Sequence, residues 1–98
     1  MHSLDSRLTK NVQIPWRLIE EEAILLDLEE GEVIRLNPVA AEIWAAIDGT
    51  RTIAEILAHI CRTFEVSEWR ARRDMDRFIK TLLHHDLVHD LAEEPSRL

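Results

Sequence analysis

The chain has 98 residues, of which 46% are hydrophobic, and its 19 acidic and 12 basic residues give a formal net charge of −7. This size and apolar content predict one small folded domain and argue against intrinsic disorder. A negative field repels a phosphate backbone, so nucleic acid is disfavoured as a partner. The apolar residues form only short runs, which predicts no membrane span and no signal peptide and leaves the cytoplasm as the default location. We expect the domain at residues 12–90, between a flexible arm at residues 1–11 and a flexible tail at residues 91–98.

Three short apolar runs follow the arm, and acidic turns separate them. The runs are WRLIE, AILLDL and EVIRL, and their spacing predicts a three-stranded antiparallel meander. The period of two then assigns side chains to faces. Residues that share a face are Ile24, Leu26 and Leu28 on the second strand, and Ile34 and Leu36 on the third. Val33 and Arg35 point the other way.

Helix boundary signals follow the third strand. Asn37 can cap a first helix with Pro38 in its first turn, and the Asp-Gly pair at residues 48–49 can end it near residue 47. Thr52 and Glu55 form a T-x-x-E capping box for a second helix at about residues 53–64. Ser67 can cap a third helix that runs to about residue 85. Leu87 and Val88 would then add a short extended segment.

Each predicted helix carries one apolar stripe at three- and four-residue steps, which predicts one buried face per helix. The stripes consist of Val39, Ala40, Ile43, Trp44 and Ile47 in the first helix, Ile53, Ile56, Leu57, Ile60 and Phe64 in the second, and Ala71, Met75, Phe78, Ile79 and Leu82 in the third. Three strands followed by three helices predict an α+β fold resembling a winged helix-turn-helix domain, with its sheet at the N-terminus.

The third strand, Glu32 to Leu36, is an edge of the meander, and its outer backbone groups stay unpaired unless something covers them. Two interpretations remain open. Glu32 and Arg35 could simply protect the edge from aggregation. Alternatively, a peptide could add itself as a fourth strand, with a neighbouring helix as the wall of the binding groove. A proline at Ile34 is then expected to remove a donor from this edge.

The third helix is the natural candidate for that wall. Helical geometry places Arg72, Asp76 and Leu83 beside Ile79 at one margin of its core face, and the opposite margin, with Asp74 and His85, remains an alternative. A basic stripe follows the face away from the core: Arg70, Arg73, Arg77, Lys80 and His84. We interpret this stripe as a solvated face rather than an anion site.

Catalytic and metal sites find little support in the sequence. A histidine cluster lies near the end of the third helix, at His84, His85 and His89. The chain has no second cysteine and no carboxylate at a ligand spacing from these histidines, so we expect them to bind no metal. Cys61, the only cysteine, lies at the margin of the second helix's apolar stripe, as a small buried hydrophobe does. Neither glycine belongs to a phosphate-binding loop. We therefore expect no catalytic residue and no cofactor.

A series of short motifs runs through about residues 16–88: an acidic-turn hairpin followed by Leu36-Asn37, Ile43-Trp44, Asp48-Gly49 with Thr52, Glu55-Ile56 and Leu87-Val88. In these motifs the chain resembles the PqqD-like proteins, also called RiPP recognition elements, which serve ribosomally made and post-translationally modified peptides. One departure is Asp86, where the family more usually has Gly.

This resemblance implies a non-catalytic module that binds the leader segment of a precursor peptide and presents it to a modifying enzyme such as a protease, a radical SAM enzyme or a cyclase. The leader is expected to pair antiparallel with the third strand. Its contacts would be Glu32, Val33, Ile34, Arg35 and Leu36, with Arg72, Asp76, Ile79 and Leu83 placed on the helix by geometry. Family members serve pyrroloquinoline quinone, lasso-peptide and radical-enzyme pathways, among which these residues do not discriminate. The alternatives are a winged-helix DNA-binding regulator and a structural subunit of a larger enzyme.

Overall fold

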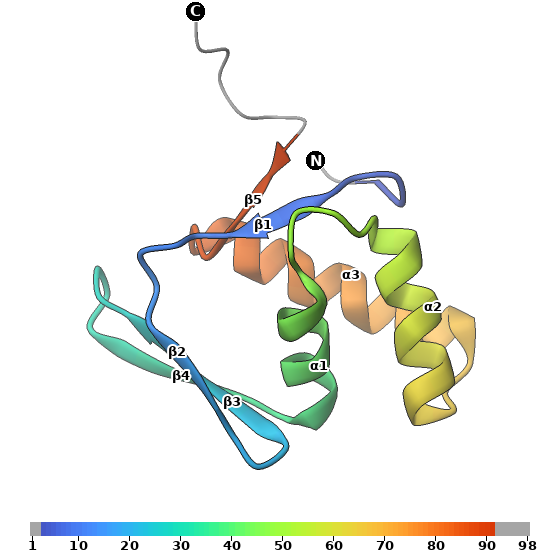
Figure 1. Cartoon of the computed structure of the whole chain (residues 1–98), viewed down its shortest axis with the longest axis horizontal. Coiled ribbons are helices and arrows are strands. Elements are labelled where there is room, and N and C mark those ends of the chain that lie inside the picture. The colour runs from blue at the N-terminus through green and yellow to red at the C-terminus, as the bar shows by residue number, and fades with distance from the viewer. Residues whose placement is uncertain (1–2, 92–98) are drawn as a thin grey trace, which may run out of the picture.

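The computed structural model describes residues 3–91 and arranges them around one hydrophobic core (Figure 1). In chain order the elements are β1 (Leu8–Lys10), β2 (Trp16–Ile19), β3 (Glu22–Asp27), β4 (Glu32–Leu36), α1 (Pro38–Ala46), α2 (Ile53–Phe64), α3 (Glu68–His84) and β5 (Val88–Asp90). Strands β2, β3 and β4 form one antiparallel sheet in that order, and β1 pairs with β5 in a second. The predicted α+β order of a meander followed by three helices is confirmed.

The β2–β3–β4 sheet buries the face opposite to the one that its largest side chains suggest. Ala23 and Leu25 are fully buried, whereas Leu26 is 36% exposed and Leu28 is 68% exposed. Alternation correctly grouped Ile24 with Leu26, but it does not say which face meets the helices. The register settles this point, because Leu25 lies opposite Ile34, and Ala23 lies opposite the buried Leu36.

Helix α1 begins and ends where its boundary residues predict. The side-chain oxygen of Asn37 accepts a hydrogen bond of 2.9 Å from the Ala40 N–H, and Pro38 occupies the first turn. Trp44 is fully buried, as predicted, but Val39 is 37% exposed. The buried side chains of the helix are Ala41, Ile43, Trp44 and Ala46. The buried stripe of α1 is thus shifted around the helix relative to the predicted one. The reason is that α1 packs against β3, β4 and α2 together.

The turn after α1 is held by the Asp48 carboxylate. It accepts hydrogen bonds from the N–H groups of Thr50 (2.9 Å) and Arg51 (3.1 Å). These bonds, that of Thr50 first, lower the pKa of Asp48 to about 2. Gly49 has a φ of +84°, a left-handed conformation that favours glycine. The predicted Asp-Gly stop is confirmed.

Helices α2 and α3 also follow their predicted caps. Thr52 and Glu55 exchange hydrogen bonds in a complete capping box, and the Ser67 hydroxyl accepts from the Arg70 N–H. The α2 stripe is buried from Ile53 to Ile60, and in α3 the buried side chains are Ala71, Met75, Ile79 and Leu82. Asp86, just after α3, has a φ of +58°, so it adopts the left-handed conformation in which the family more usually has Gly.

The prediction of a flexible arm over residues 1–11 is wrong for its described part. Strand β1 pairs antiparallel with β5, and Leu8 is only 1% exposed. The Leu8 carbonyl accepts from the Gly49 N–H at 2.8 Å. Lys10 donates to the Ile47 carbonyl at 2.6 Å, and its Nζ lies 5.2 Å from the Trp16 ring centroid. Burial lowers the pKa of Lys10, although the Asp48 charge acts in the opposite direction.

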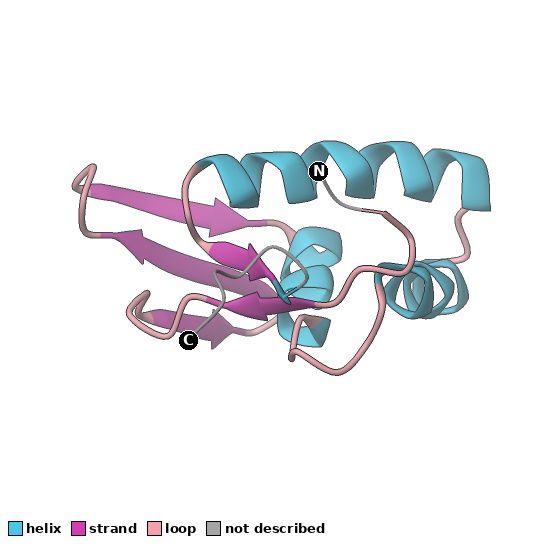
Figure 2. Ribbon diagram, turned by 90° about the horizontal axis from the view of Figure 1, so that it is seen from above, coloured by secondary structure: helices cyan, strands magenta, loops and turns pink. Residues whose placement is uncertain are grey.

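The helices lie on one side of the β2–β3–β4 sheet and leave its other face open. Figure 2 shows α3 along one side of the molecule, with β4 as the strand of this sheet nearest to it. The predicted tail at residues 91–98 lies outside the described residues, apart from Leu91, which donates to the Arg7 carbonyl.

Candidate functional site

The hydrogen bonds of β3 show which backbone groups of β4 point toward β3 and which point outward from the edge of the sheet. The Leu26 N–H donates to the Pro15 carbonyl at 3.0 Å, toward β2. In an antiparallel ladder, a residue that points its N–H and C=O at one neighbouring strand points them away from the other. Leu26 lies opposite Val33 and Ile24 lies opposite Arg35. The backbone groups of Val33 and Arg35 therefore point outward from the sheet.

By the same alternation, Glu32, Ile34 and Leu36 direct their backbone groups toward β3. The β4 edge thus offers two N–H donors and two C=O acceptors, from Val33 and Arg35. Within residues 3–91 no strand pairs with this edge, because β4 is the end of its sheet and β5 pairs with β1 instead.

Side chains on β4 divide between two environments. Leu36 is buried and Ile34 is half-buried against the core, on the face that meets the helices. Val33 is 63% exposed on the opposite face, where an Arg35 guanidinium nitrogen lies 3.5 Å from the Glu22 carboxylate. A strand added to this edge would therefore place alternate side chains beside Ile34 and beside Val33.

The C-terminal end of α3 lies against the sheet near β4. His85 Nδ1 lies 4.0 Å from Asp27 Oδ2, and Asp27 is the residue opposite Glu32. Asp27 is only 5% exposed, and its Oδ1 accepts from the N–H groups of Glu29 and Glu30. Residues three, four and seven positions apart share a helix face, so Phe78 and Thr81 lie on the same side of α3 as His85. Phe78 is half-buried and Thr81 is exposed.

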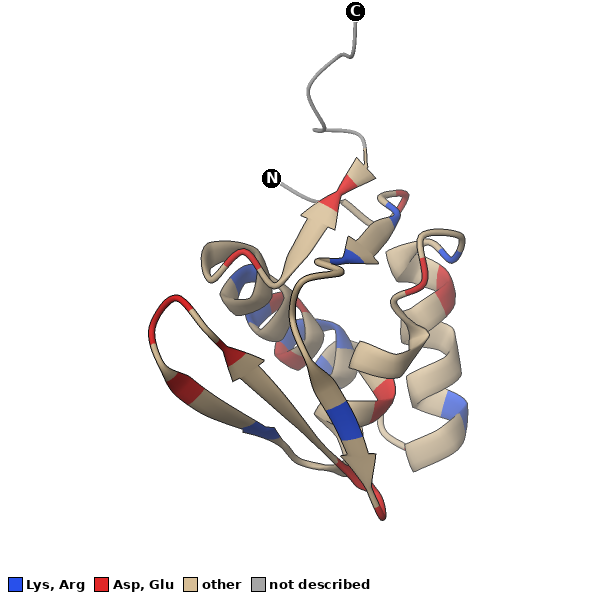
Figure 3. Ribbon diagram, turned by 60° about the vertical axis from the view of Figure 1, so that its left-hand side comes forward, with Lys and Arg blue, Asp and Glu red and all other residues tan. Residues whose placement is uncertain are grey.

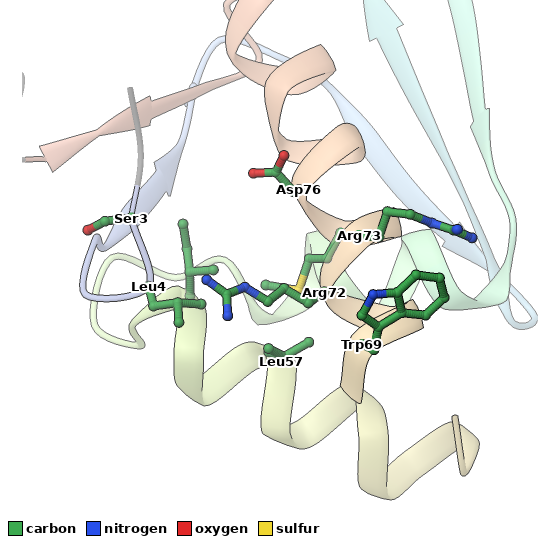
Figure 4. Close-up of a pocket in the computed structure, with 9 residues that line it drawn as sticks. Ser3, Leu4, Leu57, Trp69, Arg72, Arg73 and Asp76 are labelled. Carbon is green, nitrogen blue, oxygen red and sulfur yellow. The ribbon is translucent and has the colours of Figure 1, made fainter. Parts of the chain in front are cut away.

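The helix residues predicted to face the third strand lie elsewhere. Arg72 and Asp76 line a pocket of about 500 Å³ whose other walls come from α2 and from the N-terminal segment, including Leu57 and Leu4. Figure 4 shows Arg72 extending from α3 toward Leu4. No residue of β2, β3 or β4 lines this pocket.

The structure also shows the surroundings of the two other helix residues that were predicted to contact the leader. Ile79 is 0% exposed, so its side chain belongs to the core and has no surface for a ligand. Leu83 is half-buried and packs against the core on the Arg72 margin of the helix. Helical periodicity gives two margins of a core stripe, but it does not say which neighbour each margin meets. The structure therefore favours the margin of Asp74 and His85, to which Phe78 and Thr81 belong.

The basic stripe of α3 is exposed, as predicted, at Arg70, Arg73, Arg77, Lys80 and His84. Part of its charge is matched locally. Lys80 Nζ lies 3.2 Å from the Asp76 carboxylate, and Arg73 Nε lies 3.5 Å from that of Asp74. The Arg73 guanidinium also lies 4.8 Å from the ring centroid of Trp69, which is 69% exposed.

The three histidines near the end of α3 have ordinary partners. The His84 and His85 rings meet edge to face at 5.2 Å, and His89 Nδ1 lies 3.5 Å from the Asp86 carboxylate. Residues 3–91 contain no group of three His, Cys, Asp or Glu side chains placed to hold a metal ion. In the same part of the chain, no helix combines the length and apolarity needed to cross a bilayer.

Comparisons with known proteins identify a family and a similar fold. The family model described as Coenzyme PQQ synthesis protein D (PqqD) matches residues 22–88, from β3 to the start of β5. A solved structure of TbiB1 in complex with the TbiA(beta) leader peptide superposes with a TM-score of 0.74 and 24% sequence identity, over 91% of this chain and 99% of that one. This likeness shows a shared fold. A comparison with curated protein sequences found no match.

Proposed function

Because the chain belongs to the PqqD family, we propose that it binds the leader segment of a ribosomally made precursor peptide by strand addition at the β4 edge and delivers it to a modifying enzyme. The observation that carries the proposal is the edge itself: Val33 and Arg35 present outward backbone groups beside the C-terminal half of α3. The solved relative in fold, TbiB1, was determined with a leader peptide bound, which supports a leader peptide as the ligand here.

Main-chain pairing alone gives too little affinity, so side chains must contribute. Each hydrogen bond contributes about 0.5–1.5 kcal/mol net, and four bonds contribute roughly 2–6 kcal/mol. A dissociation constant of 1 mM already corresponds to about 4 kcal/mol. We therefore assign selectivity to apolar contacts with the half-buried Ile34 and Phe78, and to the exposed Thr81 and His85.

The five strand residues then have different roles in the proposal. Val33 and Arg35 pair with the leader backbone, while Ile34 offers its side chain to the leader residues that face α3. Glu32 and Leu36 keep β4 bonded to β3 at its two ends. On the helix, Phe78, Thr81 and His85 replace the residues chosen from the sequence.

The remaining parts of the proposal are a non-catalytic role and a separate modifying enzyme, for example a protease, a radical SAM enzyme or a cyclase. The cytoplasm, where precursor peptides are synthesised, is the proposed location. The DNA-binding alternative requires a field that attracts phosphate, whereas the chain carries a net charge of −7.

Amide hydrogen exchange measured with and without a candidate leader tests the proposal directly. Binding should slow exchange at Val33 and Arg35, because their N–H groups become bonded, and should change Ile34 much less, because its N–H already bonds to β3. The pathway's own leader is the ligand, and a scrambled leader is the control. Protection confined to surfaces away from β4 would refute strand addition and favour the structural-subunit alternative.

A further inference from the structure

The open face of the β2–β3–β4 sheet is apolar apart from Arg17 and Arg35 in its middle, and neither the core nor the proposed leader contacts use most of it. We call the outer sheet face the surface formed by Ile19, Ile24, Leu26 and Val33, together with the exposed Leu28 in the turn that follows β3. Leu26 and Val33 lie directly opposite each other, and Ile24 lies between Arg17 and Arg35 in the pairing. Ile19 is 47% exposed and Leu28 is 68% exposed. Contiguous exposed apolar surface of this kind marks interaction sites.

Both ends of this face are acidic. The β2–β3 turn carries Glu20 and Glu21, β3 begins with Glu22, and the β3–β4 turn carries Glu29 and Glu30. Figure 3 shows acidic residues at both ends of the sheet and basic residues only in its middle. Because both ends of the sheet are acidic, a second copy has no basic end that it could place against them.

This charge pattern selects the occupant. A second copy stacked face to face would bring acidic turns onto acidic turns in either orientation, which is unfavourable. An anionic membrane surface is repelled for the same reason. An apolar protein surface bordered by Lys and Arg is complementary both to the apolar residues of the face and to its acidic ends.

We propose that the outer sheet face is the docking surface for a partner protein whose apolar contact surface is bordered by basic residues, and, on the proposed leader-binding function, that this partner is the modifying enzyme. A leader strand added at β4 would extend the same face, because alternate leader side chains would lie beside Val33 and Arg35. The partner would then contact both this chain and the leader, so it should bind the leader-bound form more tightly than the free form.

Two neighbouring residues provide a matched pair of variants. Ile19 and Leu18 are adjacent on β2, 47% and 50% exposed, and point to opposite faces of the sheet. Ile19→Ser alters the outer sheet face, whereas Leu18→Ser removes a similar apolar area from the face that meets the helices. Neither residue lies on β4, so both variants leave the leader edge intact.

The probe is a synthetic peptide of alternating Leu and Lys, titrated into isotope-labelled protein, with a Leu-Glu peptide as its control. The Leu-Lys peptide should shift amides of β2 and β3 that border the outer sheet face. Ile19→Ser should weaken its binding at least about fivefold and Leu18→Ser less than about twofold, because only Ile19 is buried by the ligand. Glu21→Lys should weaken it as well, through loss of the acidic border.

Equal losses in the two serine variants, or equal binding of the Leu-Glu peptide, would overturn the proposal. Sedimentation of the free protein supplies a second check: a dimer that Ile19→Ser dissociates would make a second copy the occupant and would also overturn it. Titration of the leader itself, followed at Val33 and Arg35, tests leader binding separately, so a failure of one idea is distinguishable from a failure of the other.

Discussion

Proline substitutions along β4 should affect leader binding in alternation. Proline lacks an N–H, so at Val33 or Arg35 it removes an outward donor while leaving the β3 ladder unbroken. One leader carbonyl then stays unpaired, which costs about 1–3 kcal/mol. At about 1.4 kcal/mol per factor of ten, leader affinity should fall roughly 5- to 150-fold in Val33→Pro.

Ile34→Pro behaves differently, which corrects the expectation from the sequence. Its N–H faces β3 opposite Leu25, so proline there breaks the sheet from within rather than the edge. This variant should lower the free energy of unfolding, whereas Val33→Pro should leave it nearly unchanged. Calorimetry with the leader and urea unfolding of each variant measure the two effects. The reasoning is refuted if Val33→Pro and Arg35→Pro, once shown to be folded, bind the leader as tightly as the unaltered chain.

Three further outcomes follow from other contacts. Leu8→Ala should cost about 2–5 kcal/mol in urea unfolding, since the side chain is 1% exposed and its loss leaves a cavity; a loss near zero would make β1 dispensable. Hydrogen bonds to the charged Asp48 carboxylate hold its folded-state pKa near 2, below the usual 3.8, so they stabilise the fold above pH 3.8 and this stabilisation is lost as the pH falls toward 2. Asp48→Ala should therefore lower the urea midpoint at pH 5, and the midpoints of the variant and the unaltered chain should converge as the pH falls to 2. Arg72→Ala should change leader affinity less than about twofold, while Thr81→Arg should weaken it about tenfold by obstructing the helix side of the β4 edge; calorimetry showing the reverse order would restore the margin predicted from the sequence.

The sequence predicted the local structure well where a short-range interaction decides it. Caps at Asn37, Thr52 and Ser67 require only residues within three positions, and each forms as predicted. The Asp48-Gly49 turn is equally local. Such signals locate the ends of helices without knowledge of the tertiary fold.

Predictions that depend on distant contacts were less successful. Leu8 is buried because β1 pairs with β5, about eighty residues away along the chain at Asp90. The three residues of β1 have no composition or period that predicts a strand by themselves. The buried face of β3 depends on where α1 packs, and the margin of α3 that meets β4 depends on the contact between His85 and Asp27. Periodicity defines faces and margins, but only tertiary packing says which of them is covered.

The availability of the β4 edge depends on where the C-terminal strand goes. Strand β5 follows α3 and is extended, so it could in principle have completed the sheet by pairing with β4. It pairs with β1 instead, and β1 is anchored independently: the Leu8 carbonyl accepts from Gly49, and Lys10 donates to the Ile47 carbonyl. Strand β1 thus provides the hydrogen-bond partners of β5 and connects β5 to the turn after α1. In this fold the residues predicted to be an arm pair with β5 and so keep that strand away from the edge that the proposed ligand needs.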